Sequence, residues 1–254
     1  DPPDRAAASR LLQRAVELGV NFIDTSDAYG PGSNEQLIAD ALHPYPAGLL
    51  VATKGGIVRP SQERWDRDGR PAHLREACEA SLRRLRVERI DLYQFHAIDP
   101  DVRLEESLGE LARLQREGKI RHVGVSNFTA AELVRARRIV NVVSVQNRCN
   151  VADRSSDAVL AACERDGIAF IPWSPLARSP REPSEGPRAR LAAWAMGRGV
   201  SLAQAAIAWL LARSRAMLPI PGTADLAHLE ENVAAGSLRL TADDLAEIDG
   251  TRNA

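Results

Sequence analysis

Short apolar runs alternate with longer amphipathic stretches along the whole chain. Seven of these runs are largely apolar and lack strict alternation, which is typical of parallel strands buried on both faces. An eighth and weaker candidate follows near the C-terminus. The predicted strands are residues 20–23, 49–52, 90–93, 122–125, 142–145, 168–171, 217–220 and, weakly, 238–240.

The stretches between the runs carry apolar residues at helical spacing. One apolar stripe covers residues 8–16 and ends at Gly19, and similar stripes cover residues 74–85 and 104–112. Further helix starts are indicated where a threonine or serine precedes an acid or amide by three residues. These capping boxes are predicted at Thr129 and Glu132, Ser201 and Gln204, and Thr241 and Asp244.

Alternation of strand and helix over the full length predicts βα units around a parallel sheet. No linker or change of composition divides the chain, so we expect one domain over residues 1–254. A doubly wound sheet and a closed (β/α)8 TIM barrel both fit this alternation. A doubly wound dinucleotide-binding sheet would carry a glycine-rich turn after an early strand. Residues 24–30 are instead polar and acidic, which favours the barrel.

The number of strands departs from that of a complete barrel. A barrel of this kind closes with eight strands, whereas the pattern supplies seven before residues 238–240. The chain opens directly with a helical stretch, so we expect the first barrel strand to be missing from its N-terminal side. An unclosed barrel would have two open sheet edges, which favour aggregation.

Composition narrows the class of protein. The 33 basic and 34 acidic residues give a net charge of −1, so charge offers no reason to expect nucleic acid or an anionic membrane as partner. No apolar run approaches the ~20 residues of a membrane-spanning helix, and the first residues do not resemble a signal peptide. The three cysteines form no CxxC pair, which excludes a disulfide scaffold and suits a reducing cytoplasm. We expect a cytoplasmic protein and leave its oligomeric state open.

Polar and aromatic residues follow the strands at the end where a (β/α)8 barrel carries its chemistry. Any one of them would be unremarkable as a turn residue or a solvated charge. Their recurrence after seven successive strands indicates a functional rim. The residues are Asp24 and Tyr29, Lys54, His96, Ser126 and Asn127, Gln146 and Asn147, Trp173 and Ser174, and Gly222 and Thr223.

Four of the rim residues could act together as one catalytic group. A phenol is a weak acid at neutral pH, and an ammonium group beside it stabilises the phenolate. Lys54 would supply that ammonium to Tyr29, and Asp24 would hold Lys54 in place. His96 would orient and polarise a carbonyl oxygen. The set would protonate an oxygen as negative charge builds on it, with no activated nucleophile and no metal ion.

Six segments of the chain resemble, in order, the signature segments of the aldo-keto reductases. They are residues 24–30 (DTSDAYG), 52–56 (ATKGG), 92–96 (LYQFH), 124–128 (GVSNF), 172–176 (PWSPL) and 220–223 (IPGT). The resemblance implies a (β/α)8 fold and a nicotinamide cofactor bound without a Rossmann domain, which accounts for the absent glycine-rich turn. It also implies that Tyr29 is the proton donor of a tetrad completed by Asp24, Lys54 and His96.

The same resemblance implies a set of cofactor contacts. Ser126, Asn127 and Gln146 would hydrogen-bond the nicotinamide carboxamide, and Trp173 would stack under the ring. Thr223 precedes a helix whose N-terminal amides suit a phosphate. The other implied contacts are Ser174, Leu176 and Arg178 along the pyrophosphate, Gly222 and His228 near the 2′-phosphate, and Glu231 and Asn232 at the adenine. The resemblance implies NADP(H) as the family's usual cofactor. Many family members carry lysine or arginine near the 2′-phosphate, where this chain has Gly222 and His228, so NAD(H) is the alternative.

Substrate choice would lie in the loops. The insert at residues 59–67 either places Trp65 over the site or is a solvated surface loop. Residues 179–187 are rich in proline, glutamate and arginine, which indicates a mobile loop near the cofactor. Residues 43–46 and 145–148 look closest to the bacterial branch that includes pyridoxal reductases, which makes pyridoxal a candidate aldehyde.

We therefore expect an NAD(P)H-dependent reductase that acts on a small aldehyde or ketone. Two alternatives keep the fold. One is a keto-sugar reductase of a biosynthetic pathway, and the other is a regulatory subunit that senses nicotinamide redox state with little turnover. A non-functional fragment is a further alternative that the missing strand alone raises.

Overall fold

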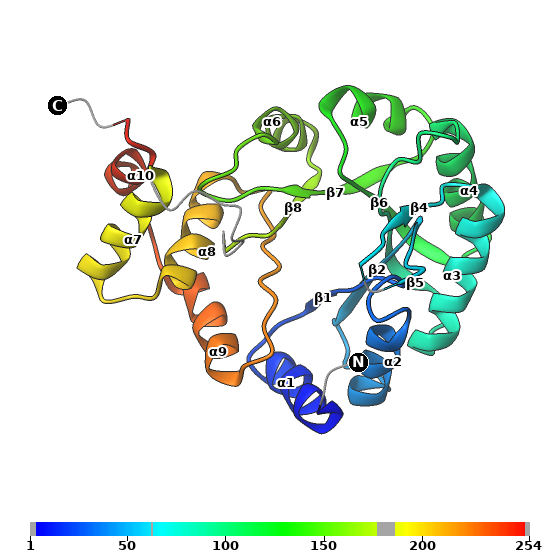
Figure 1. Ribbon diagram of the computed structural model, residues 1–254, viewed down its shortest axis with the longest axis horizontal. Coiled ribbons are helices and arrows are strands. Elements are labelled where there is room, and N and C mark those ends of the chain that lie inside the picture. Colours follow the sequence, from blue (N-terminus) through cyan, green and yellow to red (C-terminus); the bar gives the residue numbers. More distant parts are fainter. Residues whose placement is uncertain (1–3, 62, 177–185, 252–254) are drawn as a thin grey trace. The chain divides into compact units, whose positions relative to one another are not determined.

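A computed structural model describes residues 4–61, 63–176 and 186–251 of the chain. Its contacts divide it into two compact units, Asp1–Val145 and Gln146–Ala254. Strand β7 (Val142–Arg148) runs from the first unit into the second. Figure 1 shows the course of the chain through both units.

Parallel strands form the sheet of the first unit. Their order is β1 (Phe22–Asp24), β2 (Leu50–Gly55), β5 (Ile90–Phe95), β6 (Ile120–Ser126) and β7, with β1 at one edge. Register pairs Asp24 with Ala52, and Lys54 with Gln94. Because parallel strands end at the same edge of a sheet, the polar residues that follow them gather there. The five strands predicted in this unit are confirmed, and all of them end one to three residues later than predicted.

Four helices lie along one side of these strands (Figure 1). They are α2 (Ser33–Leu42), α3 (Pro71–Leu85), α4 (Leu104–Arg116) and α5 (Ala130–Arg137). The apolar stripe of α4 buries Leu108 and Leu111 completely. Full burial of one such side chain contributes about 2 kcal/mol. Helix α1 (Arg5–Glu17) precedes β1, and Gly19 ends it as predicted, with a φ of +90° that favours glycine.

A short antiparallel hairpin stands in the insert after β2. Its strands are β3 (Ile57–Val58) and β4 (Asp66–Arg67), and they pair Ile57 with Arg67. The sequence did not predict this hairpin, because two residues per strand are too few to show a period of two. The hairpin folds the insert back toward the end of β2.

The second unit contains one further strand, β8 (Ala169–Trp173), which lies beside β7. The strand predicted at residues 217–220 is wrong. Only one bridge forms there, between Phe170 and Met217, where Leu218 N donates to Phe170 O at 2.8 Å. Pro219 and Pro221 carry no N–H group, so the ladder cannot continue. Residues 238–240 are not a strand either, since they follow the 3₁₀ turn η1 (Ala235–Ser237).

The helices of the second unit are α6 (Asp157–Asp166), α7 (Pro187–Arg198), α8 (Leu202–Arg213), α9 (Leu226–Ala234) and α10 (Ala242–Asp249). Helix α8 buries Trp209 completely, and its indole Nε1 donates to Asp249 Oδ1 at 3.1 Å. The capping boxes predicted at Thr129, Ser201 and Thr241 are all confirmed. In the part of the chain that the structure describes, no single helix has the length and apolarity to cross a bilayer, and only α7 with α8 would pass, across a bend of 109°.

Candidate active site

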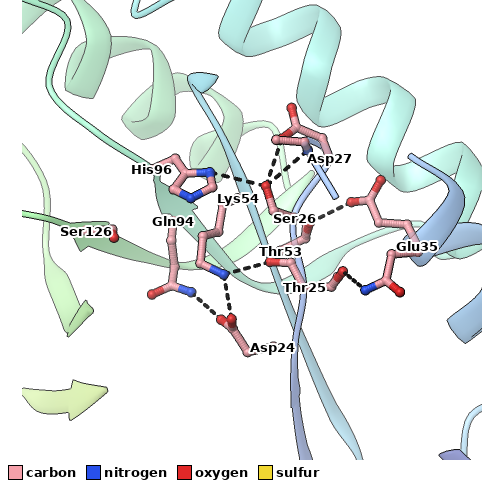
Figure 2. A network of polar contacts seen from close by, with 12 residues as sticks. Asp24, Thr25, Ser26, Asp27, Glu35, Thr53, Lys54, Gln94, His96 and Ser126 are labelled. Atoms are coloured by element: carbon pink, nitrogen blue, oxygen red, sulfur yellow. Dashed lines mark hydrogen bonds and ion pairs between the residues drawn. The ribbon is translucent and has the colours of Figure 1, made fainter. Parts of the chain in front are cut away.

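A buried ammonium group lies at the centre of the polar edge. Lys54, near the end of β2, is fully buried. Its Nζ donates to Asp24 Oδ2 at 2.5 Å and to the backbone oxygen of Thr25 at 2.9 Å (Figure 2). A charge this deep is stable only when it is paired and hydrogen-bonded. Asp24 therefore pairs with Lys54 and fixes the position of its Nζ.

The loop between β1 and α2 carries Tyr29, and the ring of Tyr29 lies beside this ammonium. Lys54 Nζ lies 5.2 Å from the centroid of the Tyr29 ring. The ring of His96 approaches Tyr29 edge-on, with centroids 6.1 Å apart and planes at 84°. The structure thus brings together all four residues predicted as a catalytic group, Asp24, Tyr29, Lys54 and His96.

His96 is a neutral imidazole in this environment. The residue follows β5 and is 7% exposed. Burial, and secondly the charge of Lys54, lower the pKa of His96 to about 3. A neutral imidazole carries one ring proton, so it can donate from one nitrogen and accept at the other.

Sequence reasoning missed Gln94, which lies two residues before His96. Gln94 Nε2 donates to Asp24 Oδ1 at 2.8 Å, so Asp24 is held by Lys54 and Gln94 together (Figure 2). The signal was present: positions two apart on a strand share one face, and Gln94 pairs in register with Lys54. Gly124 makes room for Gln94, because a Cβ there would lie 2.9 Å from Gln94 Cγ.

Ser26 also escaped the sequence analysis. Its Oγ lies 3.2 Å from Nδ1 of His96 and 3.0 Å from Oδ1 of Asp27. Ser26 is fully buried and receives a further hydrogen bond from the backbone N–H of Ala28. No sequence signal would have found this contact, since a serine beside a turn is common and its partner is 70 residues away.

Trp65 stands against Tyr29, as one of the two alternatives for the insert predicts. The ring centroids are 6.3 Å apart with planes at 70°. Trp65 is 46% exposed, and Cζ of Arg59 lies 4.4 Å from the centroid of its ring. The indole thus forms an accessible aromatic wall beside the phenol.

The predicted cofactor residues of the first unit lie next to this group. Ser126 ends β6 and is buried, and Asn127 follows it with a φ of +61°. Asn127 Nδ2 donates to Ser126 Oγ at 3.0 Å and to the backbone oxygen of His96 at 3.1 Å. The left-handed backbone at Asn127 therefore turns its amide back toward the end of β5.

The other predicted cofactor residues belong to the second unit. Trp173 ends β8, and Cζ of Arg148 lies 5.5 Å from its ring centroid. Ser174 follows with a φ of +54°, and its backbone oxygen accepts from Asn150 Nδ2 at 3.0 Å. Gln146 on β7 and Leu176 after β8 are buried. Arg178 lies outside the described residues, as does most of the loop at 179–187.

Residues around the start and end of α9 complete that set. Thr223 Oγ1 accepts from the backbone N–H of Asp225 at 3.1 Å, and Asp225 caps α9 by accepting from His228 N at 2.9 Å. Gly222 and His228 are exposed, and Glu231 is half-buried. Asn232 is buried, and none of the described residues hydrogen-bonds its Oδ1. A buried acceptor of this kind suits a ligand that brings an amino group.

Comparison with known proteins decides what kind of protein carries this arrangement. The model of the aldo/keto reductase family matches residues 1–253. The chain belongs to the aldo-keto reductase family. It is 45% identical to an uncharacterized oxidoreductase of Schizosaccharomyces pombe, over 98% of this chain and 80% of that protein. It is 40% identical to pyridoxine 4-dehydrogenase of Escherichia coli, over 98% of this chain and 88% of that protein.

Solved structures agree with this assignment. A thermostable aldo-keto reductase in complex with the inhibitor epalrestat matches with a TM-score of 0.87 at 30% identity, over 98% of this chain and 89% of that one. An aldo-keto reductase of Klebsiella pneumoniae in complex with NADPH matches with a TM-score of 0.86 at 25% identity, over 99% and 86% of the two chains. This aldo-keto reductase is an oxidoreductase, and its fold class is the (β/α)8 fold of the family.

Proposed function

We propose that this aldo-keto reductase reduces a small aldehyde or ketone to the alcohol with NADP(H), and that Tyr29 delivers the proton to the carbonyl oxygen. The observation that carries the proposal is the position of Lys54. Its buried Nζ lies 5.2 Å from the centroid of the Tyr29 ring and is held by Asp24. A cation fixed beside a phenol stabilises the phenolate that remains once the proton has left.

The cofactor proposal rests on residues of this chain and on one relative. Ser126, Asn127 and Gln146 would hold the carboxamide, and Trp173 would lie under the nicotinamide ring. The buried Oδ1 of Asn232 fits the amino group of an adenine. The Klebsiella relative in complex with NADPH supports the same class of cofactor, with NAD(H) as the alternative. When bound, the reduced nicotinamide supplies a hydride to the carbonyl carbon.

The side chains of the candidate site then have separate tasks. Tyr29 donates its hydroxyl proton, Lys54 stabilises the resulting phenolate, and Asp24 keeps Lys54 charged and in place. Neutral His96 orients the carbonyl oxygen through a hydrogen bond. Proton transfer from a positioned acid contributes about 10²- to 10⁴-fold to a rate. We place the enzyme in the cytoplasm, where its three buried cysteines remain reduced.

An aromatic aldehyde is the substrate class that we propose. Trp65 presents an exposed indole beside Tyr29, and aromatic rings stack favourably on such a surface. The relative named pyridoxine 4-dehydrogenase supports pyridoxal as the first aldehyde to test.

The test follows the loss of NADPH absorbance with pyridoxal, benzaldehyde and a nucleotide-linked keto-sugar. We expect turnover of the aromatic aldehydes, and a loss of about 10²-fold or more in kcat for Tyr29→Phe, with the Kd for NADPH unchanged. Tyr45→Phe is the matched control, since that hydroxyl donates to Leu85 O away from the site. Full activity of Tyr29→Phe would overturn the proposed proton donor. Turnover of the keto-sugar alone would overturn the proposed substrate class.

A further inference from the structure

Three side chains form a hydrogen-bonded relay that ends on His96. Asp27 Oδ1 lies 3.0 Å from Ser26 Oγ, and Ser26 Oγ lies 3.2 Å from His96 Nδ1 (Figure 2). Ala28 N–H donates to the same Ser26 oxygen at 3.1 Å. We call the side chains of Asp27, Ser26 and His96 the relay.

The relay has two possible hydrogen-bond arrangements, because the Ser26 hydroxyl has one proton and can donate it either to Asp27 or to His96. When it points to an ionised Asp27, the contact with His96 is satisfied only if Nδ1 carries the imidazole proton. When it points to Nδ1 of His96, the contact with Asp27 is satisfied only if the acid carries a proton. Each arrangement therefore ties the protonation of Asp27 to that of Nδ1.

Because His96 is neutral, the protonation of Nδ1 also determines whether Nε2 carries a proton. Because burial lowers the pKa of His96 to about 3, only one of its two nitrogens carries a proton near neutral pH. If Nδ1 is protonated, Nε2 is an acceptor. If Nδ1 accepts from Ser26, Nε2 carries the proton and is a donor.

We propose that Ser26 and Asp27 are positioning residues that set the tautomer of His96. With Asp27 protonated, Nε2 donates to the carbonyl oxygen that is to be reduced. With Asp27 ionised, Nε2 accepts from the hydroxyl of an alcohol that is to be oxidised. The inference rests on the proposed function, in which His96 faces the substrate oxygen.

The surroundings of Asp27 bring its titration into the neutral range. Burial raises the pKa of Asp27 to about 7, against the lowering effect of the Ser26 hydrogen bond. The next contribution is that of Glu35 on α2, which raises this pKa, and Arg84 on α3 lowers it. Glu35 accepts from Arg84 Nε at 2.6 Å and from Thr53 Oγ1 at 2.5 Å, so the two charges oppose each other beside Asp27.

The remaining titratable neighbours of Asp27 come from β2 and β5. Lys54 contributes its backbone oxygen, which accepts from Asp27 N at 3.3 Å, while its ammonium is held by Asp24. Tyr93 on β5 is buried, and burial raises its pKa well above the ordinary value, so its phenol stays neutral. Asp27 is thus the relay member that changes charge near pH 7.

Reduction and oxidation should therefore respond to pH in opposite directions through the relay. Below about pH 7 the acid form of Asp27 prevails, and the donor tautomer of His96 favours reduction of the carbonyl. Above that pH the acceptor tautomer favours oxidation of the alcohol. The switch itself needs only the exchange of one proton between Asp27 and solvent and a shift of protons within the relay.

Nitrogen-15 NMR of the imidazole rings tests the tautomer directly and needs no turnover. The chain has five histidines, and His96→Gln identifies the signals of His96 by their loss. In the native protein we expect a change from Nε2–H to Nδ1–H with a midpoint near pH 7. Asp27→Asn donates to Ser26 at every pH, so it should hold the Nε2–H tautomer throughout. Asp101→Asn, which removes an exposed carboxylate outside the relay, should leave the midpoint unchanged.

A kinetic measurement separates this inference from the proposed function. In the native enzyme, kcat for reduction should fall up to about tenfold per pH unit above pH 7, as for one titrating group, and it should fall more slowly in Asp27→Asn. Ser26→Ala should lose the NMR midpoint and lower kcat more than it raises KM. A single tautomer of His96 from pH 5 to 9, or an unchanged midpoint in Asp27→Asn, would overturn the relay. An active Tyr29→Phe would instead overturn the proposed function and leave the NMR result standing.

Discussion

The ammonium of Lys54 lies 2.5 Å from the carboxylate of Asp24, and the two side chains are 0% and 6% exposed. Such a pair is costly to bury and costlier to break, because the remaining charge has no partner. Asp24→Asn should therefore destabilise the protein by ~3–5 kcal/mol and lower kcat. Asp24→Asn combined with Lys54→Met should recover part of the stability and none of the activity.

Urea denaturation of both variants measures this difference. Asp40→Asn is the matched control, because Asp40 pairs with Arg5 and Arg86 at the surface and each such pair contributes ~1 kcal/mol or less. Equal stability of the native protein and Asp24→Asn would show that the pair is not coupled to folding.

Gly124 is the position at which a methyl group should reach the site through Gln94. A Cβ there would lie 2.3 Å from Ser144 Oγ and 2.9 Å from Gln94 Cγ. Gly124→Ala should therefore displace Gln94 from Asp24, lower kcat, and cost ~1–3 kcal/mol of stability. Gly109→Ala on α4 meets no atom within 4 Å and should instead stabilise by ~0.5–1 kcal/mol. Chemical denaturation and kcat of the two alanine variants provide the comparison; equal effects would contradict the steric argument.

Trp65 should control the preference for aromatic substrates. An aromatic pair contributes ~0.5–1.5 kcal/mol beyond simple burial, so Trp65→Ala should raise KM for benzaldehyde up to about tenfold. KM for a short aliphatic aldehyde should change little. Met196→Ala, at an exposed side chain on α7, is the control. Parallel changes for both aldehydes would remove Trp65 from the substrate site.

Asp225 places a carboxylate at the start of α9, close in sequence to the predicted 2′-phosphate contacts. It accepts from His228 N, and residues 219–232 contain no lysine or arginine. Asp225→Ser keeps a capping side chain and removes the charge. We expect a few-fold tighter binding of NADPH with NADH unchanged, and a smaller gain at high salt. Fluorescence titration of both cofactors checks this, and Asp243→Ser on α10 is the control. Equal gains for both cofactors would place Asp225 away from the phosphate.

The stability of the protein should depend on pH through the titration of Asp27. Its pKa is raised from 3.8 to about 7, so the folded state binds this proton more tightly than the unfolded chain. The stability that the proton contributes is present at low pH and is lost as the pH rises toward 7. Asp27→Asn keeps a neutral side chain, so its Tm relative to the native protein should be higher at pH 8 than at pH 5. Thermal melts of both proteins and of Asp101→Asn measure this, and an equal difference at both pH values would contradict the raised pKa.

The sequence predicted the local secondary structure of this aldo-keto reductase. The six strands of the main sheet and the three capping boxes depend on residues within a few positions of one another, which a sequence displays directly. The four residues of the predicted catalytic group could be named for a related reason, since each comes shortly after one of the apolar runs that predict the strands. The strand predicted at 217–220 failed for a local reason too, because the prolines at 219 and 221 interrupt pairing. That residues 1–254 form one domain stays a prediction.

The contacts that complete the candidate site were decided only by the tertiary structure. Gln94 reaches Asp24, and Ser26 reaches His96, across 70 residues of sequence in each case. Trp65 contacts Tyr29 because the insert after β2 forms a hairpin. The strands of that hairpin have two residues each, which is too short for a periodic pattern to predict them. The sequence alone determined which residues end the strands. Strand register and loop geometry determined which of those side chains meet, because a hydrogen bond requires atoms within about 3 Å and neighbours in the fold are set by pairing between distant segments.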